Sequence, residues 1–349
     1  MRGSARLSLV TGGAGFIGSH VVRLLAARGA RVRVLDLEEP VHRLDGVEFV
    51  RGSICDPATV RAACAGADWV FHLAADPNLW AADKSSFGRV NLDGTRIVLE
   101  AAHAAGAERI VYCSTESILL GKDERTDAAF DGELVHLAPD DMPGPYTRSK
   151  LLADREAFAA ARAGAPVVIV NPTLPLGPGD RKLTPPTRML LRFLNCGTPV
   201  FLDFAMNMID VRHAAFGHIL AAERGNPGER YILAGANATL GELLAMLGEI
   251  TGCRMPRWRL PHGVVLAISH ACELVADHVT HRPPIAPLEG SRLARAPMVF
   301  HATKARDALG MPETNLRRTL EDAVCWMHQR GLVHRAMPKL MAAELQPTR

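Results

Sequence analysis

The chain has 349 residues, of which 48% are hydrophobic and 22% are charged, and its formal net charge is +3. This composition is typical of a globular protein with a sizeable core, in one large or two closely joined domains. The charge is too small and too scattered to favour a nucleic-acid partner. The seven cysteines form no CxxC pair, so we expect free thiols, mostly buried, and neither a disulfide framework nor a metal site.

Targeting and membrane signals are weak. The first apolar run, 7–10, is only as long as a strand and does not resemble a signal peptide. The longest apolar stretch, 263–276, is too short to span a bilayer and contains His270 and Glu273. We therefore expect a cytoplasmic protein without a transmembrane segment, for which a peripheral membrane contact stays open. We also expect a homodimer.

In chain order, strand-like apolar runs alternate with helical patterns through the first half of the sequence. The predicted strands are 7–11, 31–36, 47–52, 68–75, 109–115 and 166–172. The predicted helices between them are 16–29, 56–66, 90–106 and 146–164. Repeated strand–helix–strand units predict an α/β fold, a doubly wound parallel sheet of Rossmann type with helices on both faces.

The pattern changes after about residue 175, where prolines cluster. Thr239 and Glu242 form a capping box that begins a helix over 239–252, and a last helix is predicted at 317–331. We expect a nucleotide-binding domain at 1–175 and a smaller substrate-binding domain at 176–335. Some segments of the second domain should return to the sheet, and 336–349 should be a tail.

The stretch TGGAGFIGSH places Gly12, Gly15 and Gly18 between the first strand and the first helix. This context predicts a dinucleotide site, in which Gly12 permits the turn and Gly15 lets a pyrophosphate approach the backbone. Gly18 would allow close packing of the helix, whose N-terminus attracts the phosphates. Phe16 and Ile17, which lie between the glycines, are expected cofactor contacts.

Asp36 ends the second predicted strand. A carboxylate there can accept hydrogen bonds from both ribose hydroxyls of the adenosine and would repel a 2′-phosphate. The sequence therefore favours NAD over NADP. Arg31 and Arg33 lie on one face of this strand, opposite to Val32 and Val34.

Six pieces in order carry a family resemblance: TGGAGFIGSH, FHLAAD, NLDGT, YCSTES, YTRSK and NPTLPLGP. Together they resemble the extended short-chain dehydrogenase/reductases, the NAD-dependent epimerase/dehydratase group. Other pieces, including AADPNLWAAD and GERYILAGANATLGELL, look most like hopanoid-associated sugar epimerases and dihydroflavonol reductase-like relatives. The C-terminal part is also somewhat similar to 3β-hydroxysteroid dehydrogenases.

The resemblance implies that Tyr146 is the acid–base group and that Lys150 assists it. Residues four apart lie on one face of a helix. A nearby ammonium and the positive nicotinamide would lower the tyrosine pKa by favouring the phenolate. Tyr146 would then take a proton from a substrate hydroxyl while hydride leaves the same carbon, and Lys150 would also hold the nicotinamide ribose.

A third group should hydrogen-bond the reacting oxygen, because the family uses Ser or Thr at the end of the fifth strand. Thr115 and Ser114 are both candidates, with Thr115 preferred. Glu116 is either an additional acid–base group, as in dehydratases of the family, or a polar residue at a strand end.

The resemblance also implies further cofactor contacts around the ends of several strands. Asn91 would support these ends from behind, and Ser53 stands where the family usually has an acid at the adenine. The remaining expected contacts are Ile54, Leu73, Ala74, Ala75, Pro172 and Thr173.

The substrate is the least determined part. Met206 stands where sugar-nucleotide epimerases of the family carry an arginine for the pyrophosphate, and a methionine cannot replace it. Arg212, Arg292 and Arg295 are candidate replacements. Trp80 is either part of a lid over the substrate or a local packing residue. The apolar stretches 200–208 and 263–275 either contact a lipid-like substrate or belong to the core.

These features predict an NAD-dependent oxidoreductase that moves hydride between the nicotinamide and a secondary alcohol or ketone. The substrate would be apolar, such as a terpenoid or sterol, or sugar-like. One alternative is a sugar epimerase or dehydratase, an isomerase in which the hydride returns to the same substrate. Another is a non-catalytic dinucleotide-binding regulator, although a pure binder needs no Tyr146–Lys150 pair.

Overall fold

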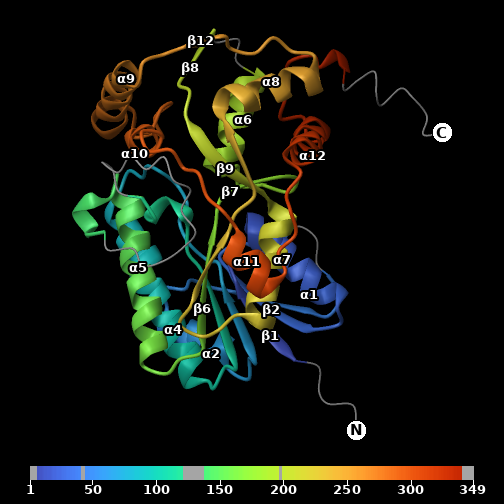
Figure 1. Cartoon of the computed structure of the whole chain (residues 1–349). Coiled ribbons are helices and arrows are strands. Elements are labelled where there is room, and N and C mark those ends of the chain that lie inside the picture. The colour runs from blue at the N-terminus through green and yellow to red at the C-terminus, as the bar shows by residue number, and fades with distance from the viewer. Residues whose placement is uncertain (1–5, 41–43, 121–136, 196–198, 340–349) are drawn as a thin grey trace, which may run out of the picture.

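A seven-stranded parallel sheet forms the centre of the computed structural model, which describes residues 6–40, 44–120, 137–195 and 199–339 (Figure 1). The strand order is β3-β2-β1-β4-β5-β6-β10. The strands are β1 Leu7–Thr11, β2 Arg31–Asp36, β3 Val47–Arg51, β4 Trp69–His72, β5 Arg109–Cys113, β6 Val167–Pro172 and β10 Arg230–Leu233. The order reverses between β1 and β4, the place where doubly wound sheets bind ligands, and the predicted α/β class is confirmed.

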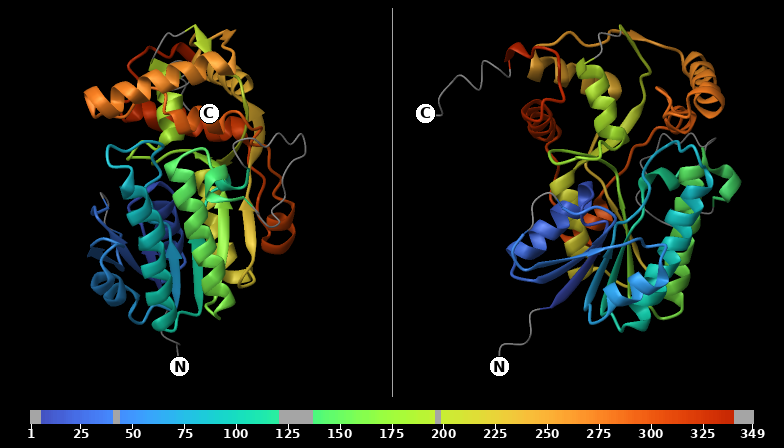
Figure 2. Two further views of the ribbon diagram at one scale, coloured as in Figure 1. Left: turned by 90° about the vertical axis from the view of Figure 1, so that its left-hand side faces the viewer. Right: turned by 180° about the vertical axis from the view of Figure 1, so that it is seen from behind.

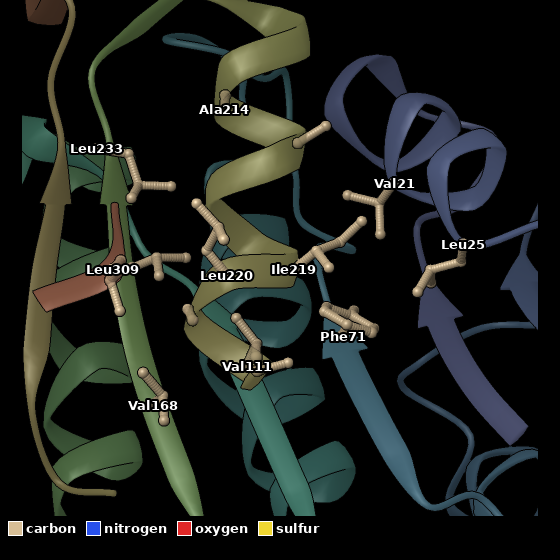
Figure 3. Close-up of a cluster of buried hydrophobic side chains, with 14 of the residues drawn as sticks. Val21, Leu25, Phe71, Val111, Val168, Ala214, Ile219, Leu220, Leu233 and Leu309 are labelled. Carbon is tan, nitrogen blue, oxygen red and sulfur yellow. The ribbon is translucent and has the colours of Figure 1, made fainter. Parts of the chain in front are cut away.

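Alternate residues of each strand face opposite sides of the sheet, and both sides are covered. One face packs on α1 (Phe16–Ala27), α7 (Val211–Arg224) and α11 (Thr303–Leu309). The other packs on α2 (Pro57–Cys64), α4 (Gly94–Ala104) and α5 (Pro145–Arg162). Figure 3 shows the first of these cores, in which Ile219 and Leu220 of α7 meet the strand side chains Phe71, Val111 and Val168.

Strand β10 enters the sheet from the second half of the chain. It pairs in parallel with β6, in a register that aligns Arg230 with Ile169. Its four residues, RYIL, are too short for a strong strand signal, and the sequence did not predict them as a strand.

A smaller lobe lies beyond the carboxyl ends of the sheet (Figures 1 and 2). It contains the strands β7 (Leu174–Leu176), β8 (Val200–Phe201), β9 (Ala205–Asp210), β11 (Ala236–Thr239) and β12 (Trp258–Arg259), and the helices α6 (Pro185–Asn195), α8 (Leu240–Thr251), α9 (His262–Val275), α10 (Leu288–Leu293) and α12 (Leu316–Gln329). The predicted capping box of α8 is confirmed, since the Glu242 amide donates to Thr239 Oγ1 at 3.2 Å and Glu242 Oε2 accepts from the Thr239 amide at 2.7 Å.

Short helices complete the chain: α3 Ser85–Phe87, the π-helices Gly88–Asp93 and Ala276–Thr280, and the 3-10 helices Glu116–Ile118 and Pro139–Asp141. Most of the expected tail, 340–349, lies outside the described residues, as does Cys196. Of the six described cysteines, only Cys64 and Cys253 are buried, so the expectation of mostly buried thiols is wrong for this part of the chain.

The two apolar stretches of the second half behave differently. Phe201, Met206 and Met208 belong to the core of the smaller lobe. In α9, by contrast, only Ser269 is buried. Within the ranges that the structure describes, no helix has the length and apolar character needed to cross a membrane.

Candidate active site

One large cavity lies between the carboxyl ends of the parallel strands and the smaller lobe. Its volume is about 900 Å³, near the upper end of the range for cofactor and small-molecule sites. Residues of the loops after β1, β2, β3, β4, β5 and β6 line one side, which we call the cofactor wall. Residues within 174–207 and 283–298 line the other side, which we call the substrate wall.

The glycine-rich loop forms part of the cofactor wall, with Gly12, Gly15 and Gly18 all at the cavity. Gly12 has φ +70°, and a Cβ there would lie 2.7 Å from the backbone nitrogen of Ala74. A Cβ on Gly18 would lie 2.1 Å from the Gly12 carbonyl oxygen. Neither position tolerates a side chain, so the loop keeps its backbone exposed at the start of α1, where helix N–H groups attract phosphate.

Asp36 reaches the cavity from the end of β2, and its carboxylate is almost fully buried. The Ala14 amide donates to Asp36 Oδ2 at 3.0 Å, which ties the carboxylate to the glycine-rich loop. Lys182, which also lines the cavity, places its Nζ 3.8 Å from Asp36 Oδ1. Sequence reasoning missed this lysine, because it lies 146 positions further along the chain.

The other expected cofactor contacts divide into two groups. Those at the cavity are Phe16, Ile17, Ser53, Ile54, Leu73, Ala74, Ala75 and Pro172. Asn91 lies behind the wall, where it donates to Ser149 Oγ and accepts from the Asp76 amide. Thr173 is also turned away, because its side chain is fully buried and donates to the Leu233 carbonyl.

Tyr146 and Thr115 come together at the same cavity, from α5 and from the end of β5. Thr115 Oγ1 donates to Glu116 Oε2 at 2.9 Å, and the Ser117 amide donates back to Thr115 Oγ1 at 3.2 Å. Glu116 also lines the cavity. The site therefore holds a phenol, a hydroxyl and a carboxyl group within one small region.

The pKa values of these groups follow from burial. Burial raises the pKa of Glu116 to about 7, while the hydrogen bond from Thr115 acts in the opposite direction. Burial also raises the pKa of Tyr146, and the neighbouring Glu116 carboxylate adds to the effect. The sequence predicted a lowered pKa for Tyr146. The difference arises because burial and the acidic neighbour dominate in the protein alone.

Lys150 lies one turn after Tyr146 on α5 but is held by other groups. Its Nζ donates to the Cys113 carbonyl at 2.8 Å and to Tyr112 Oη at 3.2 Å, and it stands over the Tyr112 ring at 4.8 Å. Burial lowers the pKa of this lysine. Lys150 is behind the residues that form the cavity surface, so Tyr112 and the end of β5 determine where its charge lies.

Ser114 reaches the cavity, but its hydroxyl is engaged elsewhere. Ser114 Oγ donates to Asp154 Oδ1 at 2.6 Å, and Asp154 also forms a buried ion pair with Arg230. These contacts join the end of β5 to α5 and β10. Of the two hydroxyls considered for the reacting oxygen, that of Thr115 is beside Glu116 at the cavity and that of Ser114 is directed into the protein.

Only some of the expected substrate residues line the cavity. Met206 and Trp80 line the cavity, and Trp80 Nε1 donates to Asp277 Oδ1 at 2.8 Å. Arg212 does not, because it is paired with Asp210 and with Asp322 of α12. Arg292 and Arg295 are likewise absent from the cavity lining.

Two arginines of α6, Arg188 and Arg192, are the guanidinium groups at this cavity. Arg188 Nη2 donates to Asn78 Oδ1 at 2.7 Å, and Arg192 donates to the Ile285 carbonyl. Neither arginine was predicted from the sequence, because the expected cation lay near Met206. A helix begun by Pro185 and Pro186, with arginines four apart on one face, was the available signal.

Glu289 is a second residue that the sequence did not reveal. Its carboxylate accepts from the amides of Tyr146 and Thr147, at 3.1 and 2.7 Å, and from Thr147 Oγ1 at 2.7 Å. It therefore caps α5 just where the helix carries Tyr146. A Cβ on Gly144 would lie 2.4 Å from Glu289 Oε2, so this glycine makes room for the contact.

Comparisons with known proteins agree with this geometry. Residues 8–234 match the profile of the NAD dependent epimerase/dehydratase family. A candidate dihydroflavonol 4-reductase of Synechocystis sp. is 36% identical over 334 residues, which cover 93% of this chain and 95% of the relative. Sterol demethylase protein B of Methylococcus capsulatus is 29% identical over 330 residues, 93% of this chain and 99% of the relative.

Among solved structures, the crystal structure of gox2253 superposes with a TM-score of 0.79 at 34% identity, covering 94% of this chain and 99% of that one. The family match covers well over half of the sequence, and the fold, the glycine-rich loop and the Tyr146–Thr115 site are all present. The chain therefore belongs to the NAD dependent epimerase/dehydratase family, whose members include oxidoreductases of the extended short-chain type.

Proposed function

We propose that the chain is an NAD-dependent oxidoreductase acting on a secondary alcohol or ketone of an apolar substrate. The observation that carries this proposal is the apolar character of the substrate wall opposite Tyr146. Its side chains include Leu174, Met189, Phe193, Phe204, Met206 and Met298. Such a surface favours a largely hydrocarbon body, because apolar area removed from water is stabilising.

The cofactor wall fits a dinucleotide. Backbone left bare by Gly12 and Gly18 suits the pyrophosphate, and Asp36 suits the adenosine ribose. When bound, NAD supplies the group that accepts or donates the hydride. Asp36 favours NAD over NADP, while Lys182 at 3.8 Å reduces the discrimination by partly neutralising its charge. We assign cofactor binding to 1–175 and substrate binding mainly to 176–335.

Tyr146 exchanges the proton of the reacting oxygen in this proposal. In the oxidative direction the Tyr146 phenolate accepts the proton of the substrate hydroxyl, and in the reductive direction the phenol returns it. Thr115 donates a hydrogen bond to the same oxygen. Lys150, buried against Tyr112 and Cys113 behind the cavity surface, supplies a fixed positive charge on the same helix face. The expected contact of Lys150 with the nicotinamide ribose requires its Nζ to leave these two partners.

The relatives support the apolar substrate. One of them is named a sterol demethylase protein, and a sterol is a secondary alcohol on a hydrocarbon ring system. Met206 agrees with this class, since a thioether in the cavity lining offers dispersion contacts and no charge. Trp80, anchored by Asp277, would cover one end of the bound substrate.

A second candidate is a sugar epimerase or dehydratase, and a specific observation favours it. Arg188 and Arg192 line the cavity from one face of α6, and guanidinium groups bind diphosphates well. In this alternative they would replace the arginine that Met206 lacks. Glu116 would then serve the extra proton transfer of a dehydration.

The two candidates differ in an experiment on the purified protein. We expect absorbance at the NADH wavelength to change with a panel of sterol and terpenoid alcohols or ketones, and we expect NAD to raise the melting temperature. Uridine and thymidine diphosphates should leave the melting temperature of the NAD-loaded protein unchanged. A clear stabilisation by these diphosphates, without NADH turnover on apolar alcohols, would establish the second candidate instead.

A homodimer and a cytoplasmic location remain predictions. Sedimentation velocity of the full chain tests the first, with a mass of two chains as the expected result.

A further inference from the structure

Helix α9 has its polarity reversed relative to an ordinary surface helix. Its acidic side faces the protein, where Glu273 Oε2 accepts from the Leu288 amide at 3.0 Å. Glu273, and Asp277 of the π-helix that follows α9, also bind Lys84 Nζ, at 3.2 and 2.7 Å. Both carboxylates are thus used to fasten α9 to the rest of the molecule, at the outer edge of the smaller lobe (Figures 1 and 2).

The outward side of the same helix is apolar. Of the eight large hydrophobic side chains that are exposed among the described residues, five lie on α9 and the π-helix that continues it. At 100° per residue they fall on one arc of the helix, with the smaller Ala267 and Ala271 between them. The five are Val264, Ile268, Leu274, Val275 and Val279, each 46–71% exposed.

Positive charge and an exposed tryptophan flank this apolar face. Trp258, 69% exposed, precedes α9 in the short strand β12. Exposed arginines stand before the helix at 254, 257 and 259 and after it at 282. Arg259 pairs with Asp203, whereas the other three have no carboxylate partner within the described ranges. Because both acids of this stretch point inward, its outward charge is positive.

The mouth of the cavity lies beside this face. Ile285 lines the cavity and is also 70% exposed, so the cavity opens to the surface there. Val265, from the inward side of α9, lines the same cavity. The path from the apolar face to the reacting groups therefore begins next to α9.

We propose that α9, its π-helical continuation, Trp258 and the flanking arginines dock the protein onto the surface of an anionic phospholipid bilayer. A helix of 14 residues is about 21 Å long, which suits a position in the plane of the interface. The tryptophan suits the headgroup level, and the arginines are complementary to anionic lipid. Delivery of an apolar substrate through the mouth at Ile285 is the part of this inference that rests on the proposed function.

A second copy of the chain is the less suitable occupant. In a two-fold dimer the same patch meets itself, so the arginines of both copies would approach one another without carboxylates to neutralise them. An anionic bilayer satisfies the apolar arc and the positive flanks together.

Vesicle flotation of the full chain tests the docking. We expect flotation with phosphatidylcholine vesicles that contain about one third phosphatidylglycerol, less in high salt, and little with phosphatidylcholine alone. Ile268→Glu/Val275→Glu and Arg257→Ala/Arg282→Ala should each weaken the partitioning by roughly tenfold or more. Ala62→Glu and Arg61→Ala, matched changes at exposed positions of α2, should not.

The result that overturns the proposal is equally concrete. It is wrong if the parent chain does not float with anionic vesicles, or if Ile268→Glu/Val275→Glu floats as well as the parent. A shift of that variant from two chains to one, without flotation of the parent, would assign the face to a second copy. The stabilisation by NAD reports folding of every variant. Flotation needs no turnover, so a failed substrate assay contradicts only the proposed function.

Discussion

The two walls of the cavity are built on different principles. The cofactor wall consists of loops that leave neighbouring parallel strands at one edge of the sheet, and its polar groups are bound to one another, as Asp36 is to the Ala14 amide. The substrate wall combines segments from 174–207 and 283–298, rich in proline and apolar side chains. The first wall is fixed by strand pairing, whereas the second depends on how distant segments pack.

Polar contacts between distant segments hold the two walls at their separation. Arg188 of α6 binds Asn78, Trp80 binds Asp277, and Glu289 binds the start of α5. Reaction geometry needs both walls, because the substrate lies on one and the proton-transferring group on the other. We therefore expect substitutions on the cofactor wall to change the chemical step directly. Substitutions in the contacts between the walls should change it by moving the substrate relative to the proton-transferring group.

The largest effect should come from Tyr146→Phe on the cofactor wall. This change keeps the ring against Phe87 and removes only the titrating oxygen, so NAD should still raise the melting temperature. Turnover should fall by roughly 10²- to 10⁴-fold, the usual contribution of a general acid–base group. Steady-state kinetics with an alcohol or ketone from the panel proposed above measures the loss.

Tyr231→Phe is the matched control for that change. Tyr231 is buried in β10 and its hydroxyl binds the Asn226 amide and Glu229, away from the cavity. Its loss should lower stability and leave turnover unchanged. Near-normal turnover in Tyr146→Phe would remove Tyr146 from the proposed mechanism.

The same contrast explains what the sequence revealed. Six strands of the sheet and the glycine-rich loop were predicted, because strand periodicity and short-range spacing determine where strand ends lie. Asp36, Thr115 and Tyr146, which short motifs singled out, lie at the cavity as expected. Lys182, Arg188 and Glu289 were not predicted. Each reaches the site from a segment more than 100 positions away from its partner, and no local pattern encodes such a contact.

Helix α9 shows the opposite limit of sequence reasoning. Its apolar residues suggested either core or a lipid-like ligand, and periodicity cannot distinguish an apolar arc that faces inward from one that faces outward. The inward contacts of Glu273 and Asp277 decide the orientation, and they depend on Lys84, Trp80 and the Leu288 amide.

A smaller effect is expected at the adenosine end of the cofactor wall. Asp36→Ala should weaken the binding of NAD by about 10- to 100-fold, because hydrogen bonds to a charged group contribute about 1.5–3 kcal/mol. The same change should narrow the difference in affinity between NAD and NADP. Lys182→Ala should widen that difference. Titration calorimetry of the two cofactors measures both changes.

Glu38→Ala is the control for Asp36. Its carboxylate also approaches Lys182, at 3.7 Å, but it does not line the cavity. Cofactor affinity should barely change. Equal affinity of the unaltered chain for NAD and NADP would contradict the role of Asp36.

We expect the protonation of Glu116 to change turnover by roughly three- to tenfold, which corresponds to the free energy of about one neutral hydrogen bond. Above pH 7 the carboxylate holds the only hydroxyl proton of Thr115, which is then turned from the reacting oxygen. Below its pKa of about 7, the protonated Glu116 can donate a hydrogen bond to Thr115. The hydroxyl proton of Thr115 is then available to the reacting oxygen. Turnover in the reductive direction should therefore fall as the pH rises through about 7.

Glu116→Gln tests this account, because its amide can donate to Thr115 at every pH. The variant should keep the higher rate and lose the inflection. The stability of the protein should also fall as the pH rises. A carboxyl whose pKa rises from 4.5 to about 7 on folding stabilises the protein most at low pH and progressively less between these values. An inflection that persists in Glu116→Gln would assign it to another group.

The smallest effect should come from Glu289→Gln, at the link between the walls. The amide oxygen can still accept from Thr147, as Oε1 does, but an NH2 group replaces Oε2 at the Tyr146 amide, and the charge at the N-terminus of α5 is lost. Together these losses cost about 1–2 kcal/mol of unfolding free energy, or about 1–3 °C in melting temperature for a chain of this length. Because the first turn of α5 carries Tyr146, turnover should also fall by a few fold while NAD affinity stays constant.

Glu242→Gln in the capping box of α8 removes a comparable charge from the N-terminus of a helix whose capping group is exposed. It should lower the melting temperature by a similar or smaller amount and leave turnover unchanged. If both variants lose stability equally and neither loses activity, Glu289 merely caps a helix, and the separation of the two walls does not depend on it.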